Sequence, residues 1–145
     1  MKIKKFSALL CGAAMLVSLL TPAMAAENKE EIIDLGDGFY AVVTLEEGPM
    51  TRAGNTKNGS KSATVYNGST AIGTATLAAT FDISGATARA TVAAINGSGQ
   101  NGWTYDHGTA SRSGNRASGT AYFKSGSTTK SFTLTLTCSP DGTIS

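Results

Sequence analysis

Alternation of apolar and polar residues dominates the second half of the chain. From Lys130 to Cys138 every second position is apolar from Phe132 onward, and the intervening residues are Ser or Thr. A period of two predicts a β-strand with one buried face. The same alternation predicts strands over 75–83, 88–94 and 117–123, with shorter ones over 62–66 and 102–106. No segment after residue 25 has the 3.6-residue period of an amphipathic helix.

Turn-forming pairs lie between many of these segments and favour short connections. They are Asn67-Gly68, Ser84-Gly85, Asn96-Gly97, Asn101-Gly102, Ser125-Gly126 and Asp141-Gly142, and Asn58-Gly59 is interpreted in the same way. Regularly spaced short strands predict an all-β fold, an antiparallel β-sandwich that is immunoglobulin-like or a partly open barrel. The predicted core consists of Leu77, Phe81, Trp103, Phe123, Phe132, Leu134 and Leu136, and in the 88–94 strand the expected inward residues are Ala88, Ala90, Val92 and Ala94.

The first 25 residues have the pattern of a secretory signal peptide. Three lysines among residues 2–5 precede an uncharged apolar run over 6–20, and Ala23-Met24-Ala25 is a small-x-small cleavage site. The run is shorter than the roughly 20 residues that a membrane-spanning helix needs. The sequence therefore predicts a secreted, extracellular, bacterial protein with no transmembrane helix in its mature chain, which retains Cys138 as its one cysteine.

Charge divides the mature chain. Residues 26–48 form an acidic segment with seven acidic residues and one lysine, and 39–45 within it is a possible extra strand. By composition, 49–59 is a linker, and 60–145 is the predicted sandwich domain. Residues 49–145 hold eight Lys or Arg and three Asp. These opposite charges allow the acidic segment to dock on the basic domain, although it could instead become ordered only in a partner.

The mature chain resembles a group of uncharacterised small secreted β-domain proteins of Gram-positive bacteria. The resemblance rests on Asp34-Leu-Gly-Asp-Gly-Phe-Tyr40, Thr51-Arg52, Thr80-Phe81 and Leu136-Thr-Cys-Ser-Pro-Asp-Gly-Thr-Ile-Ser145. It implies secretion and a β-fold, and it brings no established activity, cofactor or site residue. It also implies a second cysteine near residues 84–91 that would pair with Cys138. This chain has no cysteine there.

Candidate catalytic and metal chemistry is sparse. His107 follows Asp106, but serine, histidine and aspartate make a triad only through their arrangement in space. The acidic segment could offer oxygen ligands to calcium, but it lacks the alternating spacing of an EF-hand loop. We therefore expect no enzyme activity, no cofactor and no metal. A buried Cys138 is expected to act as a small apolar group.

Aromatic and basic residues offer the best candidates for binding. Trp103 and Tyr105 share one strand face, and with Arg112 and Arg116 they could form a platform for a ligand. A single Trp in a small sandwich more often fills the core. A second candidate is a positive face for anionic cell-wall polymers, made by Arg89, Arg112, Arg116, Lys124 and Lys130.

The sequence favours a monomeric, non-enzymatic interaction module of the extracellular space. Its partner would be a cell-wall polymer, a glycan or an extracellular protein, because a net charge of +2 is too small to indicate nucleic-acid binding. The alternatives are a small secreted antimicrobial or toxin-like protein and, last, a secreted hydrolase. No residue pattern identifies the ligand.

Overall fold

The structure is a computed structural model that describes residues 29–50 and 55–145. The predicted signal peptide and the cleavage site lie outside the described residues. Eight strands form within them: β1 (Glu30–Gly36), β2 (Phe39–Met50), β3 (Thr56–Asn67), β4 (Thr70–Asp82), β5 (Arg89–Gly99), β6 (Thr104–Ser113), β7 (Arg116–Ser125) and β8 (Thr128–Thr137). The described part of the chain contains no helix capable of crossing a membrane.

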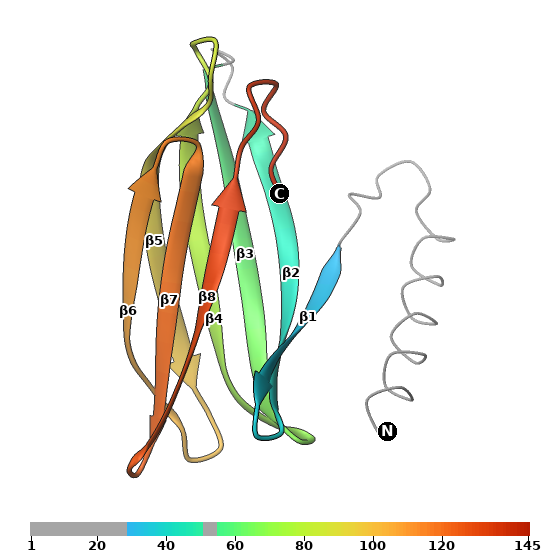
Figure 1. Cartoon of the computed structure of the whole chain (residues 1–145), viewed down its shortest axis with the longest axis vertical. Coiled ribbons are helices and arrows are strands. Elements are labelled where there is room, and N and C mark those ends of the chain that lie inside the picture. Colours follow the sequence, from blue (N-terminus) through green and yellow to red (C-terminus); the bar gives the residue numbers. More distant parts are fainter. Residues whose placement is uncertain (1–28, 51–54) are drawn as a thin grey trace, which may run out of the picture.

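The strands form two antiparallel sheets. One sheet has the order β1-β2-β3-β4-β5 and the other the order β6-β7-β8, so neighbours in each sheet are also neighbours in sequence. The sheets face each other and do not close into a barrel (Figure 1). The predicted all-β antiparallel sandwich is therefore confirmed. The strands follow chain order in both sheets, with none of the crossovers of a Greek key.

The acidic segment belongs to the sandwich. Residues 39–45 lie in β2, which pairs with β3 from Phe39↔Asn67 to Met50↔Lys57, and β1 pairs in turn with β2. The predicted linker over 49–59 is wrong where the structure describes it, because β2 reaches Met50 and β3 begins at Thr56. Small and polar residues suggested a linker, yet backbone pairing in a sheet does not require large side chains. Residues 51–54 lie outside the described residues.

The core lies between the sheets and is built from alanines around a few large side chains. Leu77, Phe81, Phe123, Phe132, Leu134 and Leu136 are all buried, as predicted, whereas Trp103 is only partly buried against the core. The acidic segment adds Phe39, Ala41 and Val43 to this core. The core therefore extends under β2 and includes residues that precede the predicted domain.

Strand β5 changes phase, which the alternation did not predict. The register with β4 shifts between Thr80 and Phe81, so Thr91 is left over as a bulge. Beyond the bulge Ala93 and Ile95 point to the core, and Val92 is 52% exposed. The prediction that Val92 and Ala94 point inward is therefore wrong, because one extra residue moves every later side chain to the other face.

Two Asn-Gly pairs predicted as turns lie inside strands. Asn58-Gly59 is in β3 and Asn96-Gly97 is in β5. These glycines make room for neighbours, because a Cβ on Gly97 would lie 2.6 Å from both the Thr74 carbonyl oxygen and the Tyr105 ring. A Cβ on Gly59 would lie 3.0 Å from the Ile144 side chain. The turn prediction is wrong here because close packing, and not a positive φ, requires glycine.

Candidate functional site

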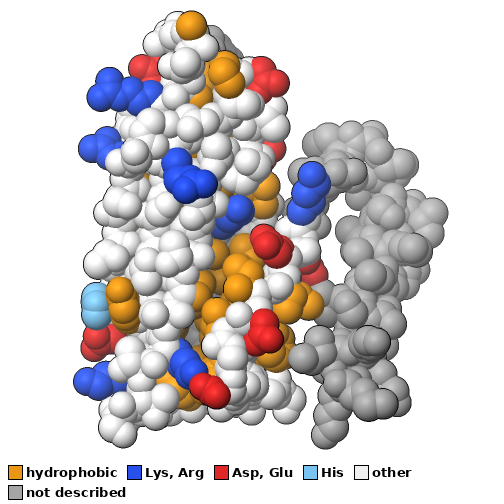
Figure 2. Space-filling model, in the orientation of Figure 1, with side chains coloured by type: hydrophobic (Ala, Val, Ile, Leu, Met, Phe, Trp, Pro, Cys, Tyr) orange, Lys and Arg blue, Asp and Glu red, His pale blue; other side chains and the backbone are white. Residues whose placement is uncertain are grey.

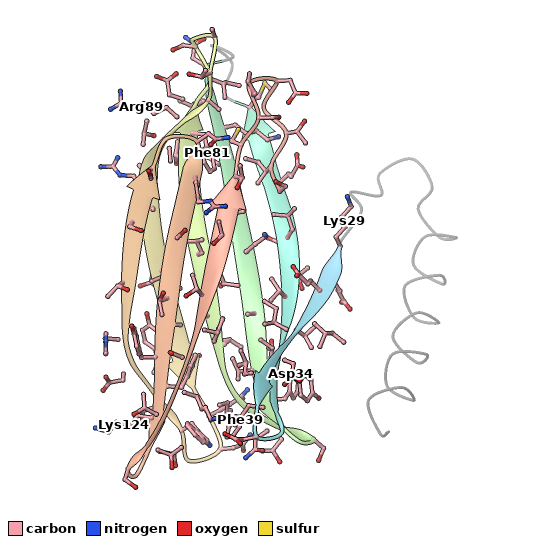
Figure 3. All side chains as sticks on the ribbon, viewed as in Figure 1. Lys29, Asp34, Phe39, Phe81, Arg89 and Lys124 are labelled. Carbon is pink, nitrogen blue, oxygen red and sulfur yellow. The ribbon has the colours of Figure 1, made fainter. Side chains whose placement is uncertain are left out.

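Arg89 lies at the upper end of the β5–β6 side, as labelled in Figure 3. Arg89 begins β5, Arg112 is near the end of β6, and Arg116 begins β7 opposite Ser113. Arg89 and Arg112 line one hollow, and we call this pair the arginine corner. Figure 2 shows blue side chains gathered at the same upper edge of the molecule. The turn at Gly114, with a φ of 56°, brings the ends of β6 and β7 together there.

A polar hollow of about 280 Å³ opens at the arginine corner. Its lining includes Arg89 and Arg112 from facing sheets, together with Asp82, Thr91 and Ser113. The Arg112 guanidinium donates to the backbone carbonyl of Thr91, the extra residue of the β5 bulge. A guanidinium has five N–H donors, so Arg112 keeps most of its donors for a ligand.

Asp82 is the one acidic side chain in the lining of the hollow. Its carboxylate accepts from the Ser84 backbone N–H at 2.9 Å. Hydrogen bonds from Ser84 and, to a smaller degree, the charge of Arg89 lower the pKa of Asp82. The carboxylate therefore stays ionised at neutral pH and offsets one arginine, so the corner keeps a net positive charge.

The structure divides the predicted platform of four residues. Arg112 belongs to the arginine corner and Arg116 begins the next strand, β7, whereas Trp103 and Tyr105 lie at the opposite end, where Tyr105 pairs with Phe123. The Trp103 ring meets the Phe39 ring edge-on at 5.6 Å, and the Tyr105 ring meets Phe123 at 5.7 Å. Both aromatic side chains are partly buried against the core and do not form one surface with the arginines.

The predicted positive face is divided in the same way. Lys124 is at the end of the molecule opposite Arg89 (Figure 3). Lys130 is near the same end, where its ammonium lies 4.6 Å from the Phe39 ring centre and 3.1 Å from the Asp37 carboxylate. Only Arg89 and Arg112 line one hollow, and Arg116 lies beside it as the pairing partner of Ser113. Sequence spacing gave no sign of this, because the fold joins the start of β5 to the end of β6.

Asp106 and His107 form an exposed pair on β6. The His107 Nδ1 lies 2.6 Å from the Asp106 carboxylate, and the imidazole stacks on Tyr122 with ring centres 4.3 Å apart. Their side chains are 45% and 55% exposed, and among the described residues no serine hydroxyl contacts the imidazole. The acid and base of a triad are adjacent, but the nucleophile and a water-excluded site are not assembled.

The acidic side chains of the β1–β2 turn serve local contacts. Asp34 accepts from the Gly36 backbone N–H at 2.8 Å, and Asp37 pairs with Lys130. Within 29–50 and 55–145, no three His, Cys, Asp or Glu side chains group as ligands of one metal ion. The calcium hypothesis gains no support from this geometry.

Cys138 is fully buried beside β8. Burial raises the pKa of its thiol, so the reactive thiolate is disfavoured. Its backbone forms an isolated bridge with Ile144 of the C-terminal tail. Cys138 is thus buried beside the tail, where its thiol packs as a small apolar group.

A second hollow, of about 320 Å³, lies on the outer face of the larger sheet. Small side chains form much of its lining, including Ser60, Ala78 and Ala94, and Glu46 and Val92 also contribute. It lacks the paired cations of the arginine corner. No protein-family model, no curated protein and no solved structure matches this chain. The candidate site therefore rests on geometry alone.

Proposed function

We propose that the protein is a secreted, non-enzymatic interaction module that binds an anionic polymer at the arginine corner. The observation that carries the proposal is the polar hollow that Arg89 and Arg112 line from facing sheets. The predicted signal peptide supports a target outside the cell.

Arginine suits phosphate and carboxylate ligands for a geometric reason. Its planar guanidinium presents N–H groups in a fork that matches two oxygens of either anion. The hollow of about 280 Å³ has room for one such group and leaves the remainder of a chain in solvent. A polymer that repeats an anionic group gains avidity, because each released group is quickly replaced by its neighbour.

The test measures binding of the purified protein to poly(glycerol phosphate), with neutral dextran as the comparison polymer. Arg89→Ala is expected to weaken binding about tenfold, the loss of one charge-assisted hydrogen bond. Binding should also fall as salt is raised. Arg112 is left unchanged because its guanidinium also contacts the Thr91 carbonyl.

Lys124→Ala provides the matched control, since it removes one cation from the opposite end of the molecule (Figure 3). It should leave binding unchanged. Equal binding to dextran, or an equal loss with Lys124→Ala, would show that the corner does not recognise an anion.

A further inference from the structure

One side of the sandwich is open because the two sheets differ in width. Strand β8 packs over β3 and β4, and β2 and β1 extend beyond it. Ile33, Leu35 and Leu45 point to the core from this extension but remain partly exposed. Figure 2 shows hydrophobic side chains along the strip between β8 and β1. We call this strip the open side.

Part of the edge of β8 on the open side has backbone groups that bond to no residue within 29–50 and 55–145. On that edge the Thr137 N–H donates to the Ser145 carbonyl and the Ser145 N–H donates to the Thr137 carbonyl, both at 2.9 Å. In an antiparallel strand every second residue has its N–H and C=O on the same edge, so the alternate residues that precede Thr137 in β8 direct these groups to the open side. The Thr135 carbonyl accepts from the Lys61 ammonium at 2.7 Å. Among the described residues, none bonds to the outward backbone groups of Ser131 and Thr133.

The C-terminal tail and β1 occupy different levels of the open side. Ile144 of the tail lies against Gly59, which pairs with Glu47 near the upper end of β2. Strand β1 pairs only with the lower part of β2, up to Thr44. The free part of the β8 edge therefore lies at the level of β1, just below the part that the tail covers.

Charges on the two rims of the open side are opposite. The β1 rim carries Glu30, Glu31 and Asp34. From the other rim, Lys61 of β3 and Lys130 of β8 reach into the space between the sheets, as their bonds to Thr135 and Asp37 show. The acidic rim of one molecule is thus complementary to the basic rim of another.

We propose that two copies of this chain join through their open sides, with β1 of each copy pairing with β8 of the other. The two copies are related by a two-fold axis that runs parallel to the strands and lies midway between the two sheet layers. Rotation about this axis places the five-stranded sheet of one copy in the same layer as the three-stranded sheet of the other, and the direction of every strand is unchanged. Strands β1 and β8 run in opposite directions (Figure 1), so the new pairs are antiparallel. The five-stranded sheet of each copy then continues into the three-stranded sheet of the other.

This arrangement addresses each feature of the open side. Ile33 and Leu35 of one copy cover β2 of the other. The sheet faces that point to the core in each copy also point to the shared core of the dimer. Ser131 and Thr133 gain backbone partners, which removes two exposed edges per molecule. Glu31 of one copy comes near the level of Lys61 of the other, because Glu31 pairs with Val43 and Lys61 with the next inward residue, Leu45. The arginine corner lies on the opposite side and stays free, so the dimer does not depend on the proposed function.

The test is sedimentation equilibrium of the purified protein over a wide concentration range, with a dimer as the expected species. Lys61→Glu and Glu31→Lys should each weaken dimerisation at least tenfold, and the double variant should restore it to within about threefold. Lys124→Glu, with the same charge change far from the open side, should leave the dimer intact.

Thr133→Pro tests the strand pairing itself. It removes an N–H that faces away from β7, so the β7–β8 pairs persist while the dimer is lost. Far-ultraviolet circular dichroism checks that Thr133→Pro folds. If this variant does not fold, the Lys61 and Glu31 charge variants still test the dimer. A monomer at every concentration, or a dimer that all these variants leave unchanged, would overturn the proposal.

Discussion

The two sides of the sandwich differ in how the sheets meet. On the β5–β6 side the chain itself crosses between sheets, and glycines let the backbones approach. A Cβ on Gly99 would lie 2.1 Å from the Trp103 carbonyl oxygen, and one on Gly108 would lie 2.1 Å from the Tyr105 hydroxyl. On the open side two lysines extend across the gap, and apolar side chains of β1 stay partly exposed.

This difference shows that the same sandwich uses two ways of ending a core. Close approach on the β5–β6 side buries the aromatic rings of Trp103 and Tyr105 in part. The lysines of the open side place positive charge beside the edge of β8. This charge restricts the strands that can pair with that edge. The sheets thus meet through flexible lysine side chains on the open side, whereas they meet through close backbone contact on the β5–β6 side, which we call the closed side.

The largest effect should come from filling the closed side. Gly99→Ala places a methyl group against the Trp103 backbone, which cannot move away as a flexible side chain could. We expect a loss of about 3 kcal/mol in the free energy of unfolding, measured by urea denaturation. Ser98→Ala, the neighbouring residue with an exposed hydroxyl contact to Thr74, should cost less than about 0.5 kcal/mol. Similar losses for both would contradict the tight contact.

Truncations on the open side should cost less than those in the covered core. Leu77→Ala removes a fully buried side chain, with an expected loss of about 3 kcal/mol. Ile33→Ala removes a partly exposed one, and we expect about 1 kcal/mol at low protein concentration. Urea denaturation of both variants measures the difference. An equal loss for Ile33→Ala would mean that β1 is already covered.

The smallest effect concerns the C-terminal turn at the upper end of the open side. The Asp141 carboxylate accepts from the Ser139 hydroxyl and from the Thr143 backbone N–H at 3.0 Å, and these bonds lower its pKa. Because the pKa of Asp141 is lower in the folded state, its ionised carboxylate stabilises the turn at any pH above the ordinary pKa of aspartate. This stabilisation is lost as the pH falls through the folded-state pKa. Loosening of the tail is therefore expected only in acid.

Asp141→Asn should loosen the tail at neutral pH. The expected result is faster reaction of Cys138, which is buried beside the tail, with a thiol reagent, while overall unfolding changes little. The rate of thiol modification gives the measurement, and Asp106→Asn on distant β6 is the control. An unchanged rate would show that the tail holds without this carboxylate.

Much of the fold followed from the sequence. The alternation around Phe132 and Leu134 predicted both the strand and its buried face, because the side-chain period of a strand is two. The failures have local causes. The bulge at Thr91 follows from pairing with β4. Gly59 and Gly97 make room for the side chains of Ile144 and Tyr105.

The candidate site was predictable only in its residue types. Arg112 was a candidate as part of an aromatic and basic platform, but Arg89, with which it lines the hollow, begins a strand of the other sheet. Trp103 and Tyr105 shared a face as predicted, yet that face packs against Phe39 and Phe123. Proximity of this kind depends on how the sheets stack, which local patterns do not encode.

The sequence by itself determined the all-β class, most strands and most of the large core residues, because alternation and turn residues act over a few neighbouring positions. Only the tertiary structure decided that the acidic segment joins the larger sheet, that two arginines from different sheets line one hollow, and that one side stays open. These outcomes depend on pairing and packing between residues far apart in the chain, where the free energy of burial is shared among many partners.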